Sequence, residues 1–159
     1  LLRVARPGET LGEHAFLTGN STLEEAEARS QTRLCVFVHD DLTKLIDQYP
    51  NIAHRMLRTL GDRLAHTEHR LTLSSQSVDV RIADYLLQQP LIRSGQVTNG
   101  IMRVQLPLSK KDIASLLGTT PESLSRALSR LRNKGFLTVD DDIVSLLQPD
   151  ELEHLITGD

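Results

Sequence analysis

The chain has 159 residues, of which 39% are hydrophobic and 25% charged, and its formal net charge at pH 7 is −3. This composition is typical of a globular protein, and the length suits one large or two small domains. No apolar run is long enough to span a membrane and no signal peptide is recognisable, so we expect a cytoplasmic protein. The single cysteine, Cys35, excludes an internal disulfide or an all-cysteine metal cluster within these residues.

Residues 1–49 are predicted to form part of a β-domain. The clearest strand is Leu34–Val38, and Asp40 is expected to cap a short helix that reaches Tyr49. Because the chain starts at Leu1 without a methionine, we expect this β-domain to begin further upstream. Short strand-like pieces are separated by turn residues, namely Pro7–Gly8, Gly12 and Gly19–Asn20.

Pro50 begins a helix that is predicted to run to about Leu73. Its apolar positions recur at alternating spacings of four and three, a pattern that predicts a two-stranded coiled coil and therefore a homodimer. The alternative is a single amphipathic helix packed on its own domain. The seam comprises Ala53, Leu57, Leu60, Leu64, Thr67 and Leu71.

Small polar residues at 74–77 interrupt the helical pattern and are predicted to form a hinge between domains. Ser77 can cap the following helix. Residues 90–100 are expected to form a loop, and Met102–Leu106 alternates as a strand. The core face of the capped helix is predicted to consist of Val78, Ile82, Ala83, Leu86 and Leu87.

Two short helices joined by a tight turn follow. Ser109 is a good N-cap for the first helix, and Gly118 suits its left-handed end. Thr120 is predicted to cap the second helix, with Pro121 at its first position, where a missing N–H has no cost. The predicted buried positions are Ile113, Leu116 and Leu117 in the first helix and Leu124, Leu128 and Leu131 in the second.

The second helix and its surroundings are basic, although the whole chain is acidic. A basic island in an acidic protein favours a polyanionic partner, whereas the alternative is an ordinary helical hairpin with a solvated charged face. Between Lys110 and Lys134 six cations face two acids, Asp112 and Glu122, a local balance of +4. The cations are Lys110, Lys111, Arg126, Arg130, Arg132 and Lys134.

After Gly135, two strands are predicted to flank Asp140–Asp142 and to form the wing of a winged helix. The residues from Val139 onward carry seven acids and no Lys or Arg. Because acids repel a polyanion, we do not expect this wing tip to contact the polyanionic partner closely. A solvated turn is favoured over a cation site at the three aspartates.

The segment Gly118–Arg126, GTTPESLSR, resembles the recognition helix of the CRP/FNR family of bacterial transcription regulators, whose pattern is roughly G-x-[ST]-x-E-[ST]-x-[SG]-R. Pro7–Glu9 and Gly12–Glu13 resemble the end of that family's β-roll. Pro50–Leu73 resembles its dimer helix, and Ser77–Leu87 its first DNA-domain helix.

The resemblance implies an α+β protein in four parts. Residues 1–49 would be the C-terminal part of a cupin-like β-roll effector domain, and residues 50–73 the dimerisation helix. Residues 74–77 would be the hinge, and residues 78–159 a winged helix-turn-helix domain. The implied function is a homodimeric activator or repressor that binds double-stranded DNA and contacts RNA polymerase.

The spacing of Glu122, Ser125 and Arg126 resembles the FNR-type branch and implies a TTGA-type inverted repeat read by residues 121–132. Arg126 can donate two hydrogen bonds to guanine, Glu122 can accept one from cytosine, and Ser125 can approach thymine. The residues expected to contact phosphates are Ser109, Lys110, Lys111, Thr119, Ser123 and Arg130.

The resemblance leaves the effector open. Gly12–Glu13 resembles the ribose-binding pair of cyclic-nucleotide-binding members. Arg29–Ser30 resembles their phosphate-binding pair in composition, but it lies too far along the chain. When the strand around Cys35–Phe37 is aligned with the family, Leu23–Glu25 falls at the position of the phosphate-binding pair. Glutamates at that position would repel a phosphate. A cyclic-nucleotide-responsive regulator of the same family is therefore an alternative.

The remaining family inputs are an iron–sulfur cluster, a haem, a redox disulfide or a small metabolite. Cys35 is the candidate redox residue, although a buried inert thiol is the favoured interpretation. No cofactor is evident in these residues. An iron–sulfur cluster or another effector would depend on ligands supplied from upstream of Leu1.

His66 and His69 lie one helical turn apart, and Glu68 or His54 could complete a metal site. Solvated positions flanking a coiled coil are the favoured interpretation, and we assign no metal. An enzyme is not expected, because the chain has no Gly-rich phosphate loop, no Cys-His pairing by spacing and no Gly-x-Ser-x-Gly motif. A dimeric sensor or adaptor that does not bind DNA is the other alternative.

Overall fold

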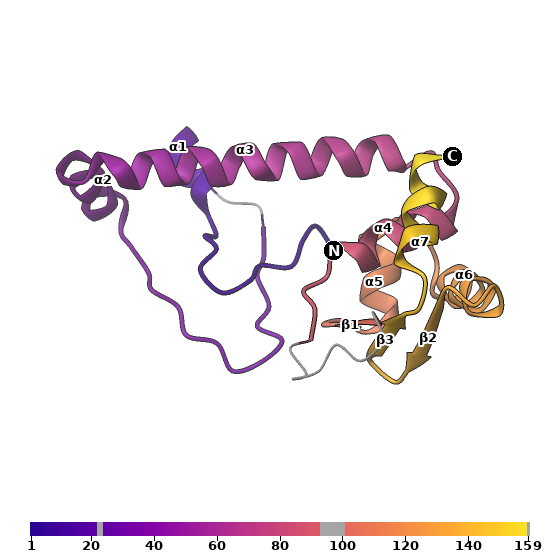
Figure 1. The fold of residues 1–159 in the computed structure, drawn as a ribbon. Coiled ribbons are helices and arrows are strands. Elements are labelled where there is room, and N and C mark those ends of the chain that lie inside the picture. The colour runs from indigo at the N-terminus through magenta and orange to yellow at the C-terminus, as the bar shows by residue number, and fades with distance from the viewer. Residues whose placement is uncertain (22–23, 93–100, 159) are drawn as a thin grey trace. The chain divides into compact units, whose positions relative to one another are not determined.

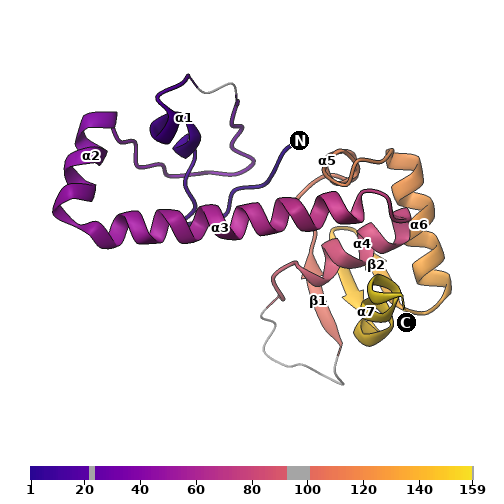
Figure 2. The same ribbon diagram turned by 90° about the horizontal axis from the view of Figure 1, so that it is seen from above.

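The computed structural model describes residues 1–21, 24–92 and 101–158 (Figures 1 and 2). Contacts divide the chain into two compact units. One comprises Arg3–His66, and the other comprises Leu1–Leu2 with Thr67–Asp159. Among the described residues, no helix is both long enough and apolar enough to cross a membrane.

The unit formed by residues 3–66 contains α1 (Glu13–Thr18), α2 (His39–Gln48) and most of α3 (Pro50–Leu73). It differs from the predicted part of a β-roll, because the described residues of this unit form no strand and none of them is buried. Gly12 precedes a helix rather than a strand. A strand needs a neighbour to pair its N–H and C=O groups, and the described part of this unit supplies none.

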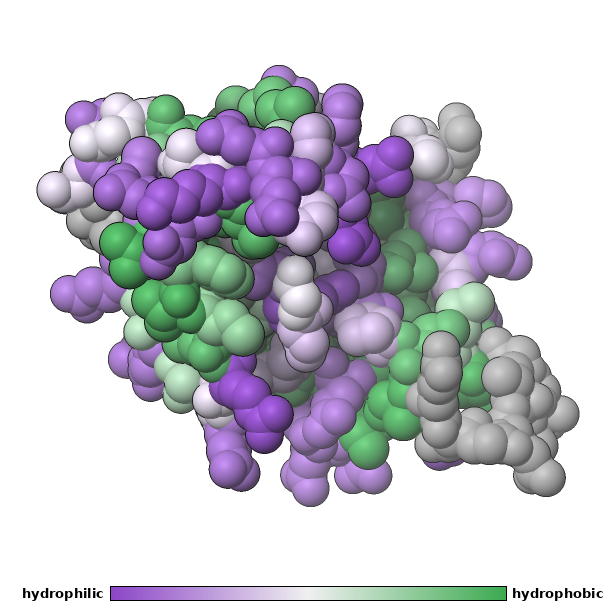
Figure 3. Space-filling model, turned by 90° about the vertical axis from the view of Figure 1, so that its left-hand side faces the viewer, coloured by the Kyte–Doolittle hydropathy of each residue, from purple (hydrophilic) through white to green (hydrophobic). Residues whose placement is uncertain are grey.

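The segment Leu34–Val38 is exposed along its whole length, and Val36 has an exposed fraction of 88%. Figure 3 shows one face of the molecule, on which apolar side chains lie open among hydrophilic ones. The thiol of Cys35 is exposed as well, so the prediction of a buried cysteine is wrong. The prediction that Asp40 caps the next helix is also wrong. The N-cap residue of α2 is Val38, the helix begins at His39, and Asp40 lies within its first turn.

The helix α3 runs from Pro50 to Leu73, as the sequence predicted. Three seam leucines at a spacing of seven residues are open to solvent, with exposed fractions of 64% for Leu57, 60% for Leu64 and 72% for Leu71. Of the other seam positions, Ala53 and Leu60 are half-buried and Thr67 is exposed. A single copy of the chain therefore leaves an apolar stripe along this helix uncovered.

The second unit is built around one hydrophobic core. It contains α4 (Val78–Leu87), β1 (Met102–Gln105), α5 (Lys110–Leu116), α6 (Pro121–Asn133), β2 (Leu137–Asp140), β3 (Ile143–Leu146) and α7 (Pro149–Thr157). The antiparallel strands form a sheet in the order β1-β3-β2. The largest fully buried side chains come from every one of these elements: Ile82, Leu86, Val104, Ile113, Leu124, Leu131, Leu137, Val144, Leu146 and Leu152.

Local capping signals position α4. The Ser77 hydroxyl accepts a hydrogen bond from the N–H of Val80 at 3.3 Å, as the sequence predicted. In the predicted loop that follows, Ile92 donates a backbone hydrogen bond of 2.8 Å to the carbonyl of Arg103 at the edge of the sheet. The rest of that loop, residues 93–100, lies outside the described residues, as does Leu23 near the N-terminus.

The turn between α5 and α6 is closed by the glycine motif that the sequence predicted. Gly118 adopts a positive φ of 61° and donates to the carbonyl of Ser115, while Thr119 donates to the carbonyl of Ala114 at 2.9 Å. This pair of bonds satisfies two carbonyls at the end of α5 in a Schellman motif. Thr120 then caps α6 by accepting from the N–H of Ser123 at 3.2 Å.

The predicted wing is present as β2 and β3, paired so that Asp140 faces Ile143. Asp141 at its tip has a positive φ of 51°, which aspartate tolerates better than most residues. The carboxylate of Asp142 accepts a hydrogen bond of 2.7 Å from the side-chain amide of Gln105. Asp142 therefore ties the wing tip to the end of β1.

The sequence interpretation missed α7, which begins with Pro149 at its first turn and ends at Gly158 in a left-handed conformation. Its Leu152 is fully buried, and the helix packs against α4. Proline at the start, acids in the first turn and glycine at the end are ordinary helix signals.

Candidate nucleic-acid interface

The helix α6 separates its side chains into a buried and an exposed face. Its buried residues are Leu124, Ala127, Leu128 and Leu131, which includes the predicted stripe. Glu122, Ser125 and Arg126 are all exposed. Positions three and four residues apart lie above one another on a helix, so these three side chains share one face. The structure therefore brings the predicted base-reading residues together at the surface.

A chain of hydrogen bonds orders the N-terminal half of that face. The Thr120 hydroxyl donates to Ser123 Oγ at 3.2 Å, and Arg126 Nη2 donates to the same Oγ at 3.3 Å. The pKa of Glu122 is lowered, chiefly by a hydrogen bond from its own backbone N–H. Glu122 is therefore an ionised acceptor at neutral pH, and Ser123 helps to hold Arg126.

The predicted phosphate-contacting residues differ in how free their side chains are. Lys110 and Lys111 are exposed. The Ser109 hydroxyl is engaged in capping α5, since it accepts from the N–H of Asp112 at 3.2 Å and donates to its carboxylate at 2.7 Å. Thr119 is half-buried in the turn. The lysines are thus the most accessible members of this group.

Arg130, another predicted phosphate contact, is paired with Asp79 of α4. Its Nε donates to Asp79 Oδ2 at 3.0 Å, and its Nη2 donates to Asp79 Oδ1. The pKa of Arg130 is raised, first by these hydrogen bonds. The pair fixes α6 against α4. Residues 51 positions apart form it, so no local sequence pattern could have indicated it.

We expect this pair to act as a clamp that stabilises the fold. Arg130→Gln and Asp79→Asn should each lower the midpoint of thermal unfolding, and the double variant should lose less than the sum of the two. The coupling should shrink as salt is added, because both side chains are partly solvated. A double-mutant cycle at two salt concentrations measures it, and strictly additive losses would show that the pair contributes nothing.

Two arginines support the turn between α5 and α6 from behind. Arg81 of α4 donates to the carbonyls of Leu117 at 2.6 Å and Gly118 at 3.2 Å. Arg70, in the last turn of α3, donates to the carbonyl of Leu116. The last carbonyls of a helix lack intrahelical partners and carry partial negative charge, so guanidinium groups stabilise them. The sequence interpretation assigned no role to either arginine.

Near Arg70, His69 of α3 also contacts α4, because its Nε2 lies 2.8 Å from Asp84 Oδ1. This contact engages one of the histidines considered for a metal site. No group of three or more His, Cys, Asp or Glu side chains able to hold a metal occurs among the residues that the structure describes.

Together, α4–α7 and the sheet define a winged helix-turn-helix domain with α6 in the position of a recognition helix. Residues 80–155 match the family model of Crp-like helix-turn-helix domains. Residues 80–155 are therefore similar to the helix-turn-helix domain of Crp-like transcription regulators.

The similarity to characterised proteins extends over nearly the whole chain. It is 28% identical, over 96% of its length, to a CRP-like cAMP-activated global transcriptional regulator of Mycobacterium tuberculosis, of which it covers 68%. It is 29% identical, over 95% of its length, to the nitrogen fixation regulation protein FixK of Bradyrhizobium diazoefficiens, of which it covers 62%. These relatives are transcription regulators, in agreement with the expectation that the chain is not an enzyme.

Two solved structures have a similar fold. The structure of FixK2 from Bradyrhizobium japonicum is 28% identical, with a TM-score of 0.60, and the match covers 74% of this chain and 58% of that one. A CooA variant from Carboxydothermus hydrogenoformans has a TM-score of 0.63 at 21% identity, over 74% of this chain and 54% of that one. The chain thus spans a little more than half the length of these structures.

Proposed function

We propose that the protein is a homodimeric transcription regulator that inserts α6 of each protomer into the major groove of a TTGA-type inverted repeat. The observation that carries this proposal is the common exposed face of Glu122, Ser125 and Arg126 on a helix whose opposite face is buried. The three side chains offer an ionised acceptor, a hydroxyl and a guanidinium fork, which can recognise cytosine, thymine and guanine respectively.

The open leucine stripe of α3 supports a dimer. Leu57, Leu64 and Leu71 are exposed at intervals of one heptad, and a second copy of the same helix would cover them in a coiled coil. A two-fold symmetric protein matches an inverted repeat, because each recognition helix then meets an identical half-site. A dimeric adaptor that does not bind DNA would need the stripe but not the exposed base-reading face.

An effector or redox signal sensed by the N-terminal unit would control binding. In that unit the Glu13 carboxylate, the expected ribose ligand of a cyclic nucleotide, is paired with Arg63 and lies 3.7 Å from Arg3. A carboxylate held by two arginines is a poor ribose ligand, although one relative is named as cAMP-activated. The exposed thiol of Cys35 is open to oxidation. As a regulator of transcription, the protein would act in the cytoplasm with RNA polymerase.

The test is binding of the full-length protein to a TTGA-type inverted repeat and to a scrambled duplex at one fixed salt concentration. We expect clear preference for the inverted repeat, because base contacts add to phosphate contacts that both duplexes share. Measurements in air, with a reductant and with cyclic AMP separate a redox input from a nucleotide input. Equal binding to both duplexes under all three conditions would overturn the proposed site.

A further inference from the structure

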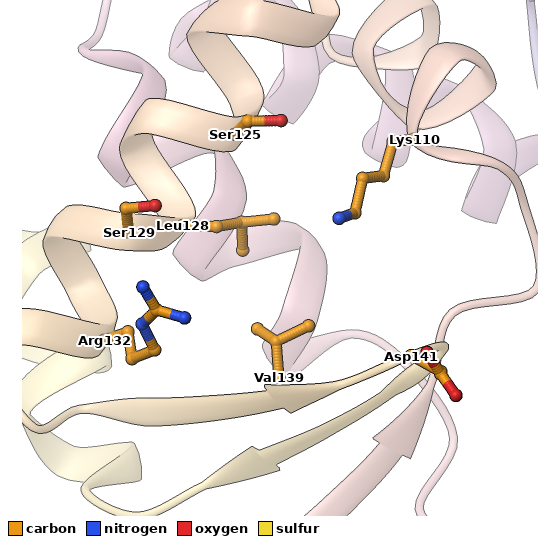
Figure 4. A pocket seen from close by; sticks show the side chains of 7 residues that line it. All are labelled: Lys110, Ser125, Leu128, Ser129, Arg132, Val139 and Asp141. Carbon is orange, nitrogen blue, oxygen red and sulfur yellow. The ribbon is translucent and has the colours of Figure 1, made fainter.

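A pocket of about 260 Å³ lies between α6, the first residue of α5 and the wing. In Figure 4 Lys110 reaches the pocket from α5 and Arg132 from α6, while the carboxylate of Asp141 points away from the other labelled side chains. Leu128 and Val139 provide its apolar surface. The full lining is Lys110, Ser125, Leu128, Ser129, Arg132, Val139 and Asp141.

The polar groups of this lining are mostly hydrogen-bond donors. Lys110 and Arg132 are cations without acceptor atoms, and Ser125 and Ser129 each carry a hydroxyl that can donate. Two cations against the single carboxylate of Asp141 leave a net positive charge. The ligand that suits such a pocket is an oxyanion, because its oxygens accept several charge-assisted hydrogen bonds at once.

The pocket adjoins the face that would read bases. Ser125, Ser129 and Arg132 lie four and three residues apart, so they follow one another along the same side of α6. Ser125 belongs both to this row and to the base-reading group. When a helix enters the major groove, the residues flanking its base-reading face meet the sugar-phosphate walls.

We propose that this pocket receives a phosphate of the DNA backbone, with Arg132 and Lys110 supplying charge and Ser129 a hydrogen bond. The inference rests on the proposed function, and it adds Ser129 and Arg132 to the interface. Within the described residues, Arg132 makes no side-chain hydrogen bond or ion pair, whereas the neighbouring Arg130 is held by Asp79. The guanidinium of Arg132 is therefore available to bind a phosphate, although it lies beside an acidic wing tip.

The test compares Arg132→Gln with the wild-type full-length protein on the inverted repeat and on the scrambled duplex, over a range of salt concentrations. Loss of one phosphate contact should reduce the slope of log K against log salt by about 0.9 for each half-site occupied, on both duplexes alike. Arg55→Gln is the matched control, because it removes the same charge from an exposed position of α3 outside the seam.

A second variant, Ser129→Ala, should weaken binding to both duplexes without changing the salt slope, because it removes a neutral donor. An unchanged slope in Arg132→Gln, together with wild-type preference for the inverted repeat, would overturn the pocket assignment and leave the proposed function intact. Absence of that preference in the wild type would count against the proposed function, while the slope on the scrambled duplex would still decide the role of Arg132.

A free anion is the other source of the same chemistry. The binding series is therefore repeated with inorganic phosphate in place of chloride at equal ionic strength. If the backbone fills the pocket, inorganic phosphate should compete with DNA, so the DNA affinity should fall in phosphate for the wild type and not for Arg132→Gln protein. A wild-type DNA affinity that is the same or higher in phosphate, although calorimetry shows that the wild type binds phosphate and Arg132→Gln protein does not, would assign the pocket to a free anion and overturn the inference.

Discussion

Replacing Arg126 by alanine is expected to abolish the proposed preference of the protein for guanine at one position of each half-site. The guanidinium is exposed on α6, and Ser123 Oγ accepts from it at 3.3 Å, so it is held close to where a base edge would lie. A bidentate contact to guanine contributes about 1–3 kcal/mol of discrimination, which corresponds to roughly 5- to 150-fold in affinity. Competition binding with each of the four bases at every half-site position measures the loss.

Two further variants separate base reading from simple attraction. Arg126→Lys keeps the charge but lacks the planar fork, so it should also lose discrimination while retaining most of the salt dependence. Lys110→Ala should weaken binding to all sequences alike and flatten the salt dependence. If Arg126→Ala and Lys110→Ala both weaken every sequence to the same degree, the assignment of Arg126 to a base is wrong.

Replacing Leu64 by glutamate is expected to convert the proposed dimer to a monomer and to abolish tight binding to the proposed inverted repeat. Leu64 lies in the middle of the exposed stripe, with Leu57 and Leu71 one heptad away on either side. In a coiled coil the two copies of residue 64 would pack together, and two facing carboxylates cannot be buried there without a large desolvation cost. Losing the link between two half-site contacts should reduce affinity by roughly 10²-fold or more.

Sedimentation equilibrium measures the oligomeric state, and DNA titrations on one and two half-sites measure the linkage. His66→Glu is the matched control, because residue 66 is exposed on α3 but lies outside the seam. It should remain a dimer. A Leu64→Glu protein that stays dimeric would place the interface elsewhere and would leave the leucine stripe to another partner.

The helix-turn-helix could be predicted because its signals are local. Ser109, Thr120 and Gly118 act within three or four residues of themselves, and the structure shows each of them in the predicted capping or turn position. The buried stripe of α6 follows from its helical period in the same way. The exposed face of Glu122, Ser125 and Arg126 is then the geometric consequence of that period.

Other features of the structure could not be predicted from local sequence. They depend on contacts between residues far apart in the chain, or on strand pairing that the described residues do not provide. Leu34–Val38 has the composition of a strand, but composition cannot form a sheet without a neighbouring strand. The contact between Arg130 and Asp79 crosses 51 positions, and that between Arg81 and Leu117 crosses 36. A count of charges in the sequence treats both arginines as available to a ligand, whereas in the structure both bind other groups of the same domain.

The final turn of α3 belongs structurally to the winged helix-turn-helix domain. His69 contacts Asp84, and Arg70 holds the carbonyl of Leu116, so this turn is fastened to the domain ahead of residues 74–77. A fragment of the protein cut at Ser77 would therefore expose Asp84 and leave the end of α5 without one of its two arginine supports. The natural boundary for an isolated DNA-binding fragment lies upstream of Thr67, inside a continuous helix.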